Sequence, residues 1–205
     1  MRKRVICFIL ALLMLPCSAL AMQSHPESFR RDYYLTGDPA EDICRVAKVQ
    51  GGLCRSELGY TNAWCAEFVC DCARLAGVPS SVIPRSSSCT TMYNSLMENG
   101  ASIVYIPQAG DLVFYVGKNR RTGERFIFHV GIMTGRDTSV QGNIGNGEKR
   151  VRADMDPNSL GRRSYDWECR YVRPVYSVAG DGQQVAFLSP YKHLFGRIFT
   201  FLLFR

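Results

Sequence analysis

The chain passes from a loop into a helix within the stretch Tyr60-Thr61-Asn62-Ala63-Trp64-Cys65-Ala66-Glu67-Phe68-Val69. Apolar residues recur at helical spacing from here onward, which predicts a helix from about residue 63 to residue 76, capped by Asn62 or Thr61. Cys65 then lies in the first turn, where unpaired backbone N–H groups and the helix dipole favour a thiolate. The stretch therefore predicts a helix with a nucleophile at its N-terminal end.

A histidine lies in the middle of the predicted strand Phe126-Ile127-Phe128-His129-Val130-Gly131-Ile132-Met133. Strand alternation assigns two groups to opposite faces: Phe126, Phe128, Val130 and Ile132 on one, and Ile127, His129, Gly131 and Met133 on the other. A lone strand histidine is more often structural than catalytic. Its coupling to Cys65 at a helix start favours the Cys–His arrangement of a nucleophilic hydrolase. Gly131 beside it leaves room for a neighbouring backbone or a substrate.

The remaining pattern predicts the fold class. Two further helices are expected at residues 39–49 and 88–99. After Gly100 the period becomes strand-like, and strands separated by turn residues are predicted at 103–105, 112–116, 126–133, 138–141, 151–153 and 170–175. Helices followed by a run of strands predict an α+β domain with an antiparallel sheet, on which the helix bearing Cys65 packs.

The two ends of the chain differ from its middle. Residues 1–21 combine a basic start, an apolar core and a small-residue site, which is typical of a secretory signal peptide, with a retained anchor as the alternative. Residues 22–41 are expected to form an arm, either a tether or a strapped-down segment, before the domain at 42–176. Residues 177–205 form a linker and an apolar tail. The tail is too short to span a bilayer and is expected to pack on the domain or to form a terminal helix, with contact to a membrane surface or a partner as the alternative.

The predicted export bears on the oxidation state of the cysteines. Seven cysteines remain after the signal peptide: Cys44, Cys54, Cys65, Cys70, Cys72, Cys89 and Cys169. An odd number in an exported protein predicts one free thiol, assigned to Cys65, beside up to three disulfide bonds. The alternative is that most of them are small buried hydrophobic residues.

The charge excludes some classes of partner. Removing the three basic residues of the signal peptide lowers the net charge from +7 to +4, because residues 1–21 contain no acid. Basic clusters at 118–125 and 149–152 are expected to be solvated hairpin tips, with attraction to an anionic wall polysaccharide as the alternative. No zinc-finger spacing, phosphate-cradling loop or internal repeat is present, so no nucleic-acid partner is expected. The sequence predicts no oligomeric state.

Four blocks of the chain form an ordered motif pattern: Trp64-Cys65-Ala66-Glu67-Phe68-Val69, Pro107-Gln108-Ala109-Gly110-Asp111-Leu112-Val113-Phe114, His129-Val130-Gly131-Ile132 and Arg170-Tyr171-Val172-Arg173-Pro174. In the same order, these blocks resemble those of the CHAP family, the cysteine- and histidine-dependent amidohydrolases and peptidases of the NlpC-type papain-like superfamily. The resemblance covers about residues 42–176. It implies a papain-like (NlpC/CHAP-type) fold, with N-terminal helices packed on an antiparallel sheet, and catalysis by Cys65 and His129.

The third catalytic position departs from the family. Where the family usually has glutamate-x-asparagine, this chain has Gln141-Gly142-Asn143. An amide carbonyl can orient an imidazole, but without the charge of a carboxylate. Both Gln141 and Asn143 are kept as candidates, with Asn143 the safer one because it matches. Trp64, next to the nucleophile, is expected to bind substrate.

The resemblance also implies a function. CHAP enzymes hydrolyse amide bonds of bacterial peptidoglycan, so a secreted enzyme of the cell envelope is expected, either an N-acetylmuramoyl-L-alanine amidase or a peptidoglycan endopeptidase. No cofactor or metal is expected. Some members of the family bind calcium through an acid-rich loop, but Glu57 is the only acidic residue among residues 55–64. The alternative is a catalytically inactive, wall-binding or interaction protein on a CHAP scaffold. An acyltransferase using the same thiol is a third, weaker alternative.

Overall fold

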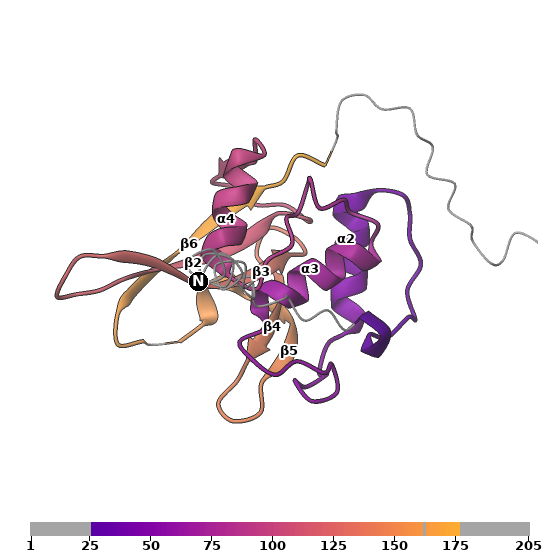
Figure 1. Ribbon diagram of the computed structural model, residues 1–205, viewed down its shortest axis with the longest axis horizontal. Coiled ribbons are helices and arrows are strands. Elements are labelled where there is room, and N and C mark those ends of the chain that lie inside the picture. Colours follow the sequence, from indigo (N-terminus) through magenta and orange to yellow (C-terminus); the bar gives the residue numbers. More distant parts are fainter. Residues whose placement is uncertain (1–25, 162, 177–205) are drawn as a thin grey trace, which may run out of the picture.

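The structure is a computed structural model that describes residues 26–161 and 163–176 (Figure 1). The predicted signal peptide at 1–21 and the predicted linker and tail at 177–205 lie outside the described residues. Within the described ranges, no helix has the length and apolar character needed to cross a membrane.

Three α-helices form where the sequence predicts them: α2 (Pro39–Val49), α3 (Cys65–Leu75) and α4 (Cys89–Glu98). Short 3-10 turns, η1 and η2, occupy Pro26–Ser28 and Pro157–Ser159. Asp38 caps α2 and Ser88 caps α4 through their side-chain oxygens. The expected cap of α3 by Asn62 or Thr61 is wrong, because the helix begins later and its N-cap is Trp64, which makes no side-chain capping bond.

The described strands form one six-stranded sheet in the order β1-β6-β2-β3-β4-β5, and every neighbouring pair is antiparallel. The strands are β1 (Ser102–Val104), β2 (Leu112–Lys118), β3 (Arg125–Met133), β4 (Ser139–Ile144), β5 (Arg150–Met155) and β6 (Asp166–Arg173). The α+β class expected from the sequence, helices first and then an antiparallel sheet, is confirmed.

The main core lies between the helices and one face of this sheet. Figure 1 shows α3 between α2 and the strands, and α3 contacts β3 and β4 while α4 contacts β3. Phe68 and Val69 on α3 pack with Phe114 and Ile132 of the sheet, and all four are fully buried. Burying side chains of this size stabilises the fold by about 1.5–3 kcal/mol each. This packing fixes the N-terminal end of α3 against the centre of the sheet.

A β-bulge interrupts the expected alternation of β3. The register pairs Tyr115 with His129 but Val116 with Ile127, so Phe128 is the extra residue. Ile127 packs with the helix-side core, whereas Phe128 joins a small second cluster built on Val113, Tyr115 and Met133. The predicted grouping of Phe126 and Phe128 with Val130 and Ile132, and of Ile127 with His129, is therefore wrong. One inserted residue reverses the face of every side chain before it.

Two of the family-like blocks meet in a single ion pair. Arg173 on β6 donates two hydrogen bonds of 2.8 Å to the carboxylate of Asp111, which directly precedes β2. Asp111 also accepts the backbone N–H of Gln108 at 2.8 Å. Its carboxylate is almost fully buried, so the paired geometry compensates for desolvation of the charge. The pair ties β6 to the turn that enters β2 and is structural.

The N-terminal arm is strapped to the domain over its described part. Phe29 is buried and stacks on Phe68 with ring centroids 5.9 Å apart. Gln50 accepts the backbone N–H of Arg30 at 2.9 Å and donates to the Arg30 carbonyl at 3.1 Å. Helix α2 begins at Pro39, before the expected domain boundary at residue 42. The segment from residue 26 to the helix therefore belongs to the packed domain.

All seven cysteines of the described chain are free thiols, and six of them are buried. Residues 26–161 and 163–176 contain none of the expected disulfide bonds. The sulfur atoms of Cys65 and Cys89 are 3.4 Å apart, far beyond the bond length of about 2.05 Å. Cys44 donates to the Met133 carbonyl at 3.2 Å, and Cys70 accepts the backbone N–H of Ser86 at 3.3 Å. These thiols behave as small buried side chains with weak hydrogen-bonding capacity.

Candidate active site

The structure brings Cys65 and His129 together. Cys65 is the first residue of α3, and β3 delivers His129 at the bulge. His129 and the backbone of Val130 act directly on the Cys65 thiol and lower its pKa. Each of the two side chains is only 5% exposed. The pairing of a helix-start thiol with a strand imidazole is therefore present, in a nearly closed site.

The thiols differ in their acidity. The pKa of Cys65 is held well below its usual value, first because the Cys89 thiol hydrogen-bonds to it and then because His129 attracts the thiolate, against the opposing effect of burial. Burial is the largest effect at three other thiols: it raises the pKa of Cys44 to about 11, of Cys70 to about 12 and of Cys169 to about 11. Only the lowered value is compatible with a nucleophile near neutral pH.

Gln141 on β4 orients the histidine. Its Oε1 lies 3.0 Å from Nε2 of His129. Its Nε2 donates to the Tyr115 hydroxyl at 2.5 Å and to Ser139 Oγ at 2.9 Å. Because both amide hydrogens are used, the oxygen must face the ring, and Nε2 of the neutral imidazole must be the protonated nitrogen. Nδ1 is then left with a lone pair that can accept the proton of the Cys65 thiol.

Two glycines make room for this arrangement. A Cβ on Gly131 would lie 2.7 Å from Cγ of Gln141, so a side chain there would displace the orienting residue. The space that the sequence suggested for a backbone or a substrate is occupied by the Gln141 side chain and by the backbone of β4, whose Val140 carbonyl oxygen would lie 3.1 Å from that Cβ. A Cβ on Gly142 would lie 2.6 Å from the Trp64 ring, so this glycine lets β4 pack closely against the start of α3. The Gln-Gly pair thus brings the helix and the orienting amide to the same place.

Asn143 does not take the orienting role, although it was the safer assignment from the sequence. The ladder between β4 and β5 is irregular after Gln141, and Asn143 has a left-handed backbone with φ of 64°. This change of conformation breaks the alternation that would have aligned residues 141 and 143. Asn143 instead lines a cavity of about 250 Å³ together with the basic residues Lys149, Arg152 and Arg163.

Trp64 cannot bind substrate as expected, because its side chain is fully buried. Its ring stacks on Tyr60 with centroids 5.0 Å apart and meets the edge of Phe68 at 6.0 Å. It packs the start of α3 against β4, beside Gly142. An aromatic residue before a helix has the same sequence pattern in either role, and only the packing distinguishes them.

Sequence reasoning missed three residues of the site: Tyr115, Ser139 and Cys89. Tyr115 lies in an apolar strand and is fully buried, and its ring centroid lies 5.3 Å from that of His129. Ser139 is fully buried and bridges Gln141 to the Met155 carbonyl. Cys89 was counted among the disulfide cysteines. A buried polar side chain facing another polar residue has no local sequence signal, since its partner comes from a different strand.

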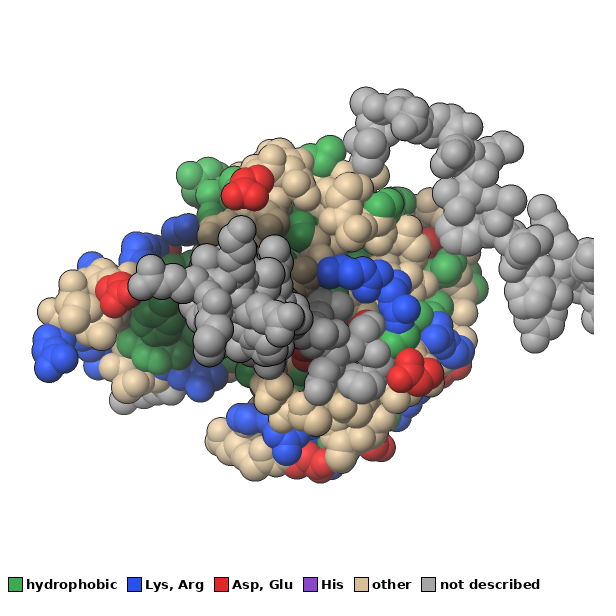
Figure 2. All heavy atoms as spheres, in the orientation of Figure 1, with side chains coloured by type: hydrophobic (Ala, Val, Ile, Leu, Met, Phe, Trp, Pro, Cys, Tyr) green, Lys and Arg blue, Asp and Glu red, His purple; other side chains and the backbone are tan. Residues whose placement is uncertain are grey.

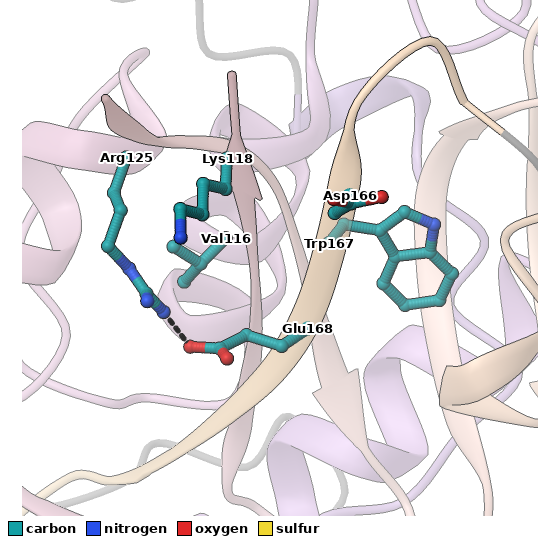
Figure 3. Close-up of a pocket in the computed structure, with 6 residues that line it drawn as sticks. All are labelled: Val116, Lys118, Arg125, Asp166, Trp167 and Glu168. Atoms are coloured by element: carbon teal, nitrogen blue, oxygen red, sulfur yellow. Dashed lines mark hydrogen bonds and ion pairs between the residues drawn. The ribbon is translucent and has the colours of Figure 1, made fainter. Parts of the chain in front are cut away.

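A second group of charged residues lies on the hairpin of β2 and β3, which projects to the left in Figure 1. Figure 3 shows a small cavity there, lined by Val116, Lys118, Arg125, Asp166, Trp167 and Glu168, with Arg125 paired to Glu168. Arg120 pairs with Asp166 at 2.9 Å. Figure 2 shows acidic side chains (red) beside the basic ones (blue) on this hairpin. The 118–125 cluster is thus partly neutralised by its neighbours, which favours the solvated-tip interpretation.

Across residues 26–161 and 163–176, His, Cys, Asp and Glu side chains form no group of three or more that could hold a metal ion. No family model matches the chain, and neither a curated protein nor a solved structure matches it.

Proposed function

We propose that the protein is an exported cysteine amidohydrolase or peptidase with a papain-like (NlpC/CHAP-type) fold, and that it hydrolyses amide bonds of bacterial peptidoglycan. The observation that carries the proposal is the chain of contacts from Cys65 through His129 to Gln141. The ordered motif resemblance of residues 42–176 to the CHAP family supports it independently.

In the proposed mechanism the Cys65 thiolate attacks the carbonyl carbon of the scissile amide. The protonated His129 then gives its proton from Nδ1 to the leaving amine, and the resulting thioester is released by a water from which His129 removes a proton. Gln141 holds Nε2 throughout and so keeps Nδ1 directed at the reaction. The backbone N–H of Cys65, at the uncapped start of α3, is the candidate donor to the developing oxyanion.

The cavity lined by Asn143 is suited to an anionic substrate. It is lined by Lys149, Arg152 and Arg163, and Asn143 follows Gln141 by two positions on the same strand. Peptide stems of a cell wall carry carboxylates, which basic side chains bind through charge-assisted hydrogen bonds. Both an amidase and an endopeptidase would use such a cavity, and both reactions need the same thiol chemistry.

A second candidate function is wall binding without catalysis. The observation that favours it is the 5% exposure of both Cys65 and His129, which leaves little surface for a substrate to reach. The retained acid–base geometry favours the enzyme, because a pure binding protein has no need of an imidazole held in one tautomer by a buried amide.

Incubation of the purified protein with peptidoglycan, followed by mass analysis of the soluble fragments, tests the two candidates. The variants Cys65→Ala and Cys72→Ala, both of which remove a buried thiol from α3, form a matched pair. We expect new amine and carboxyl ends with the wild type and Cys72→Ala, and none with Cys65→Ala. Equal sedimentation of all three with the wall, without new ends, would establish the binding protein instead. If the wild-type protein neither cleaves nor binds peptidoglycan, peptidoglycan is refuted as its substrate.

A further inference from the structure

A second thiol contacts the proposed nucleophile. Cys89 is the first residue of α4, and its Sγ lies 3.4 Å from Sγ of Cys65, which is the first residue of α3. The two helix starts therefore converge on one pair of sulfur atoms. Neither the motif resemblance nor the proposed mechanism gives Cys89 a role.

The position of Cys89 is fixed by a hydrogen-bonded loop. Ser86 Oγ donates to the Ser88 carbonyl at 2.9 Å and accepts the Ser88 backbone N–H at 3.0 Å, and Ser88 caps α4. The loop is tied in turn to α3, because Cys70 accepts the Ser86 backbone N–H at 3.3 Å. Helix α3 thus carries the nucleophile and also anchors the loop that places its neighbour. Such bracing is what a contact between two side chains needs in order to persist.

The surroundings decide which sulfur carries the charge. Cys65 faces His129 on β3 and the backbone of Val130, and both favour its thiolate. The groups that act most strongly on the Cys89 thiol are the sulfur atoms of Cys65 and Cys70 and its own backbone N–H. The pKa of Cys89 is accordingly raised, first because it hydrogen-bonds to the Cys65 sulfur and then because it is buried. The shared proton therefore stays on Cys89.

We propose that Cys89 is a positioning residue: its S–H donates to the Cys65 sulfur, holds the thiolate beside His129 and stabilises the charge that burial would otherwise disfavour. This rests on the proposed function, in which Cys65 is the nucleophile. Cys89 keeps its proton throughout and forms no bond to substrate. A stabilised thiolate is less nucleophilic, but the logarithm of its rate constant falls by only about 0.4–0.5 for each unit by which the pKa is lowered. Near neutral pH the larger fraction of thiolate therefore outweighs the loss of nucleophilicity.

The rate of Cys65 alkylation by iodoacetamide as a function of pH, measured by peptide mass, tests this proposal. A hydrogen bond to a charged group corresponds to a shift of about one to two pH units. We expect Cys89→Ala to move the midpoint of Cys65 alkylation upward by about that amount, and Cys89→Ser, which keeps a donor, to restore most of it. Cys72→Ala removes a buried thiol from the same core and is expected to leave the midpoint unchanged.

The proposal is overturned if Cys89→Ala leaves the midpoint in place, if Cys72→Ala shifts it as much, or if Cys89→Ser in a folded protein restores nothing. Should Cys89→Ala not fold, Cys89→Val fills a similar volume without a donor and permits the same comparison. A wild-type Cys65 that alkylates like an ordinary thiol would instead refute the proposed nucleophile. The experiment therefore separates the failure of this inference from the failure of the proposed function.

Discussion

Replacing Gln141 with leucine removes the whole hydrogen-bonding centre of the site without changing its approximate size. The substitution deletes the contact to Nε2 of His129 and the two bonds donated to Tyr115 and Ser139. The position is fully buried, so water cannot replace these partners. His129 would then be free to rotate, and either ring nitrogen could carry the proton.

The magnitudes follow from the number and kind of lost bonds. The bond to the imidazolium that forms during catalysis contributes about 1.5–3 kcal/mol. Its loss is expected to lower kcat/KM by about 10- to 100-fold, since each 1.36 kcal/mol corresponds to a factor of ten. Two buried groups, the Tyr115 hydroxyl and the His129 ring N–H, lose their partner, at a cost of about 1–3 kcal/mol each in stability. Ser139 keeps its bond to the Met155 carbonyl and adds little.

The assay is the initial rate of fragment release from peptidoglycan at enzyme concentrations corrected for the folded fraction by circular dichroism. Gln141→Glu is the matched control, because it keeps an acceptor for His129 and the Tyr115 hydroxyl can donate to it, while Ser139 keeps its bond to the Met155 carbonyl. We expect Gln141→Glu to be at least as active as the wild type. A folded Gln141→Leu protein with activity within about threefold of the wild type would refute the orienting role, given the loss expected for a charged hydrogen bond.

Three other outcomes are expected. At pH 6 iodoacetamide should label Cys65 before Cys70, whose pKa burial raises to about 12, and mass mapping that finds Cys70 labelled first would contradict the assignment. Gly131→Ala should lower activity by displacing Gln141 and cost about 1–3 kcal/mol in urea unfolding, while Gly135→Ala serves as a control. The free energy of unfolding should fall as the pH rises from about 8.5, where unfolded thiols ionise, toward 11–12, because the folded Cys44 and Cys70 keep their protons. Urea midpoints at pH 8 and at higher pH check this, and an unchanged midpoint would contradict it.

The helices and strands were largely predictable because their signals are local. The helix expected at residues 39–49 matches α2, and the expected strand at 126–133 lies within β3. Hydrophobic period and stop signals depend on neighbours within a few positions, which the sequence displays directly. The face of each residue on β3 was not predictable, because the bulge at Phe128 depends on pairing with β2 and leaves no mark in the alternation itself.

The site divides in the same way. The residues Cys65 and His129 were identified from the types of side chain and their places at a helix start and on a strand. The residue that orients His129 is Gln141, although the motif pattern ranked Asn143 higher. The left-handed backbone of Asn143 removes its side chain from the face that Gln141 shares with the histidine. The role of Trp64 changed from substrate contact to packing for a comparable reason, since burial depends on what a distant strand places beside it.

The sequence alone determined that a thiol begins an amphipathic helix, that a histidine lies on a strand, and that helices precede an antiparallel sheet. Each of these follows from the chemistry and spacing of residues close together in the chain. The tertiary structure alone decided which amide holds the histidine and which second sulfur touches Cys65. The partners in these contacts come from different strands or from two helices, so the interactions exist only after packing has brought the separate elements within hydrogen-bonding distance.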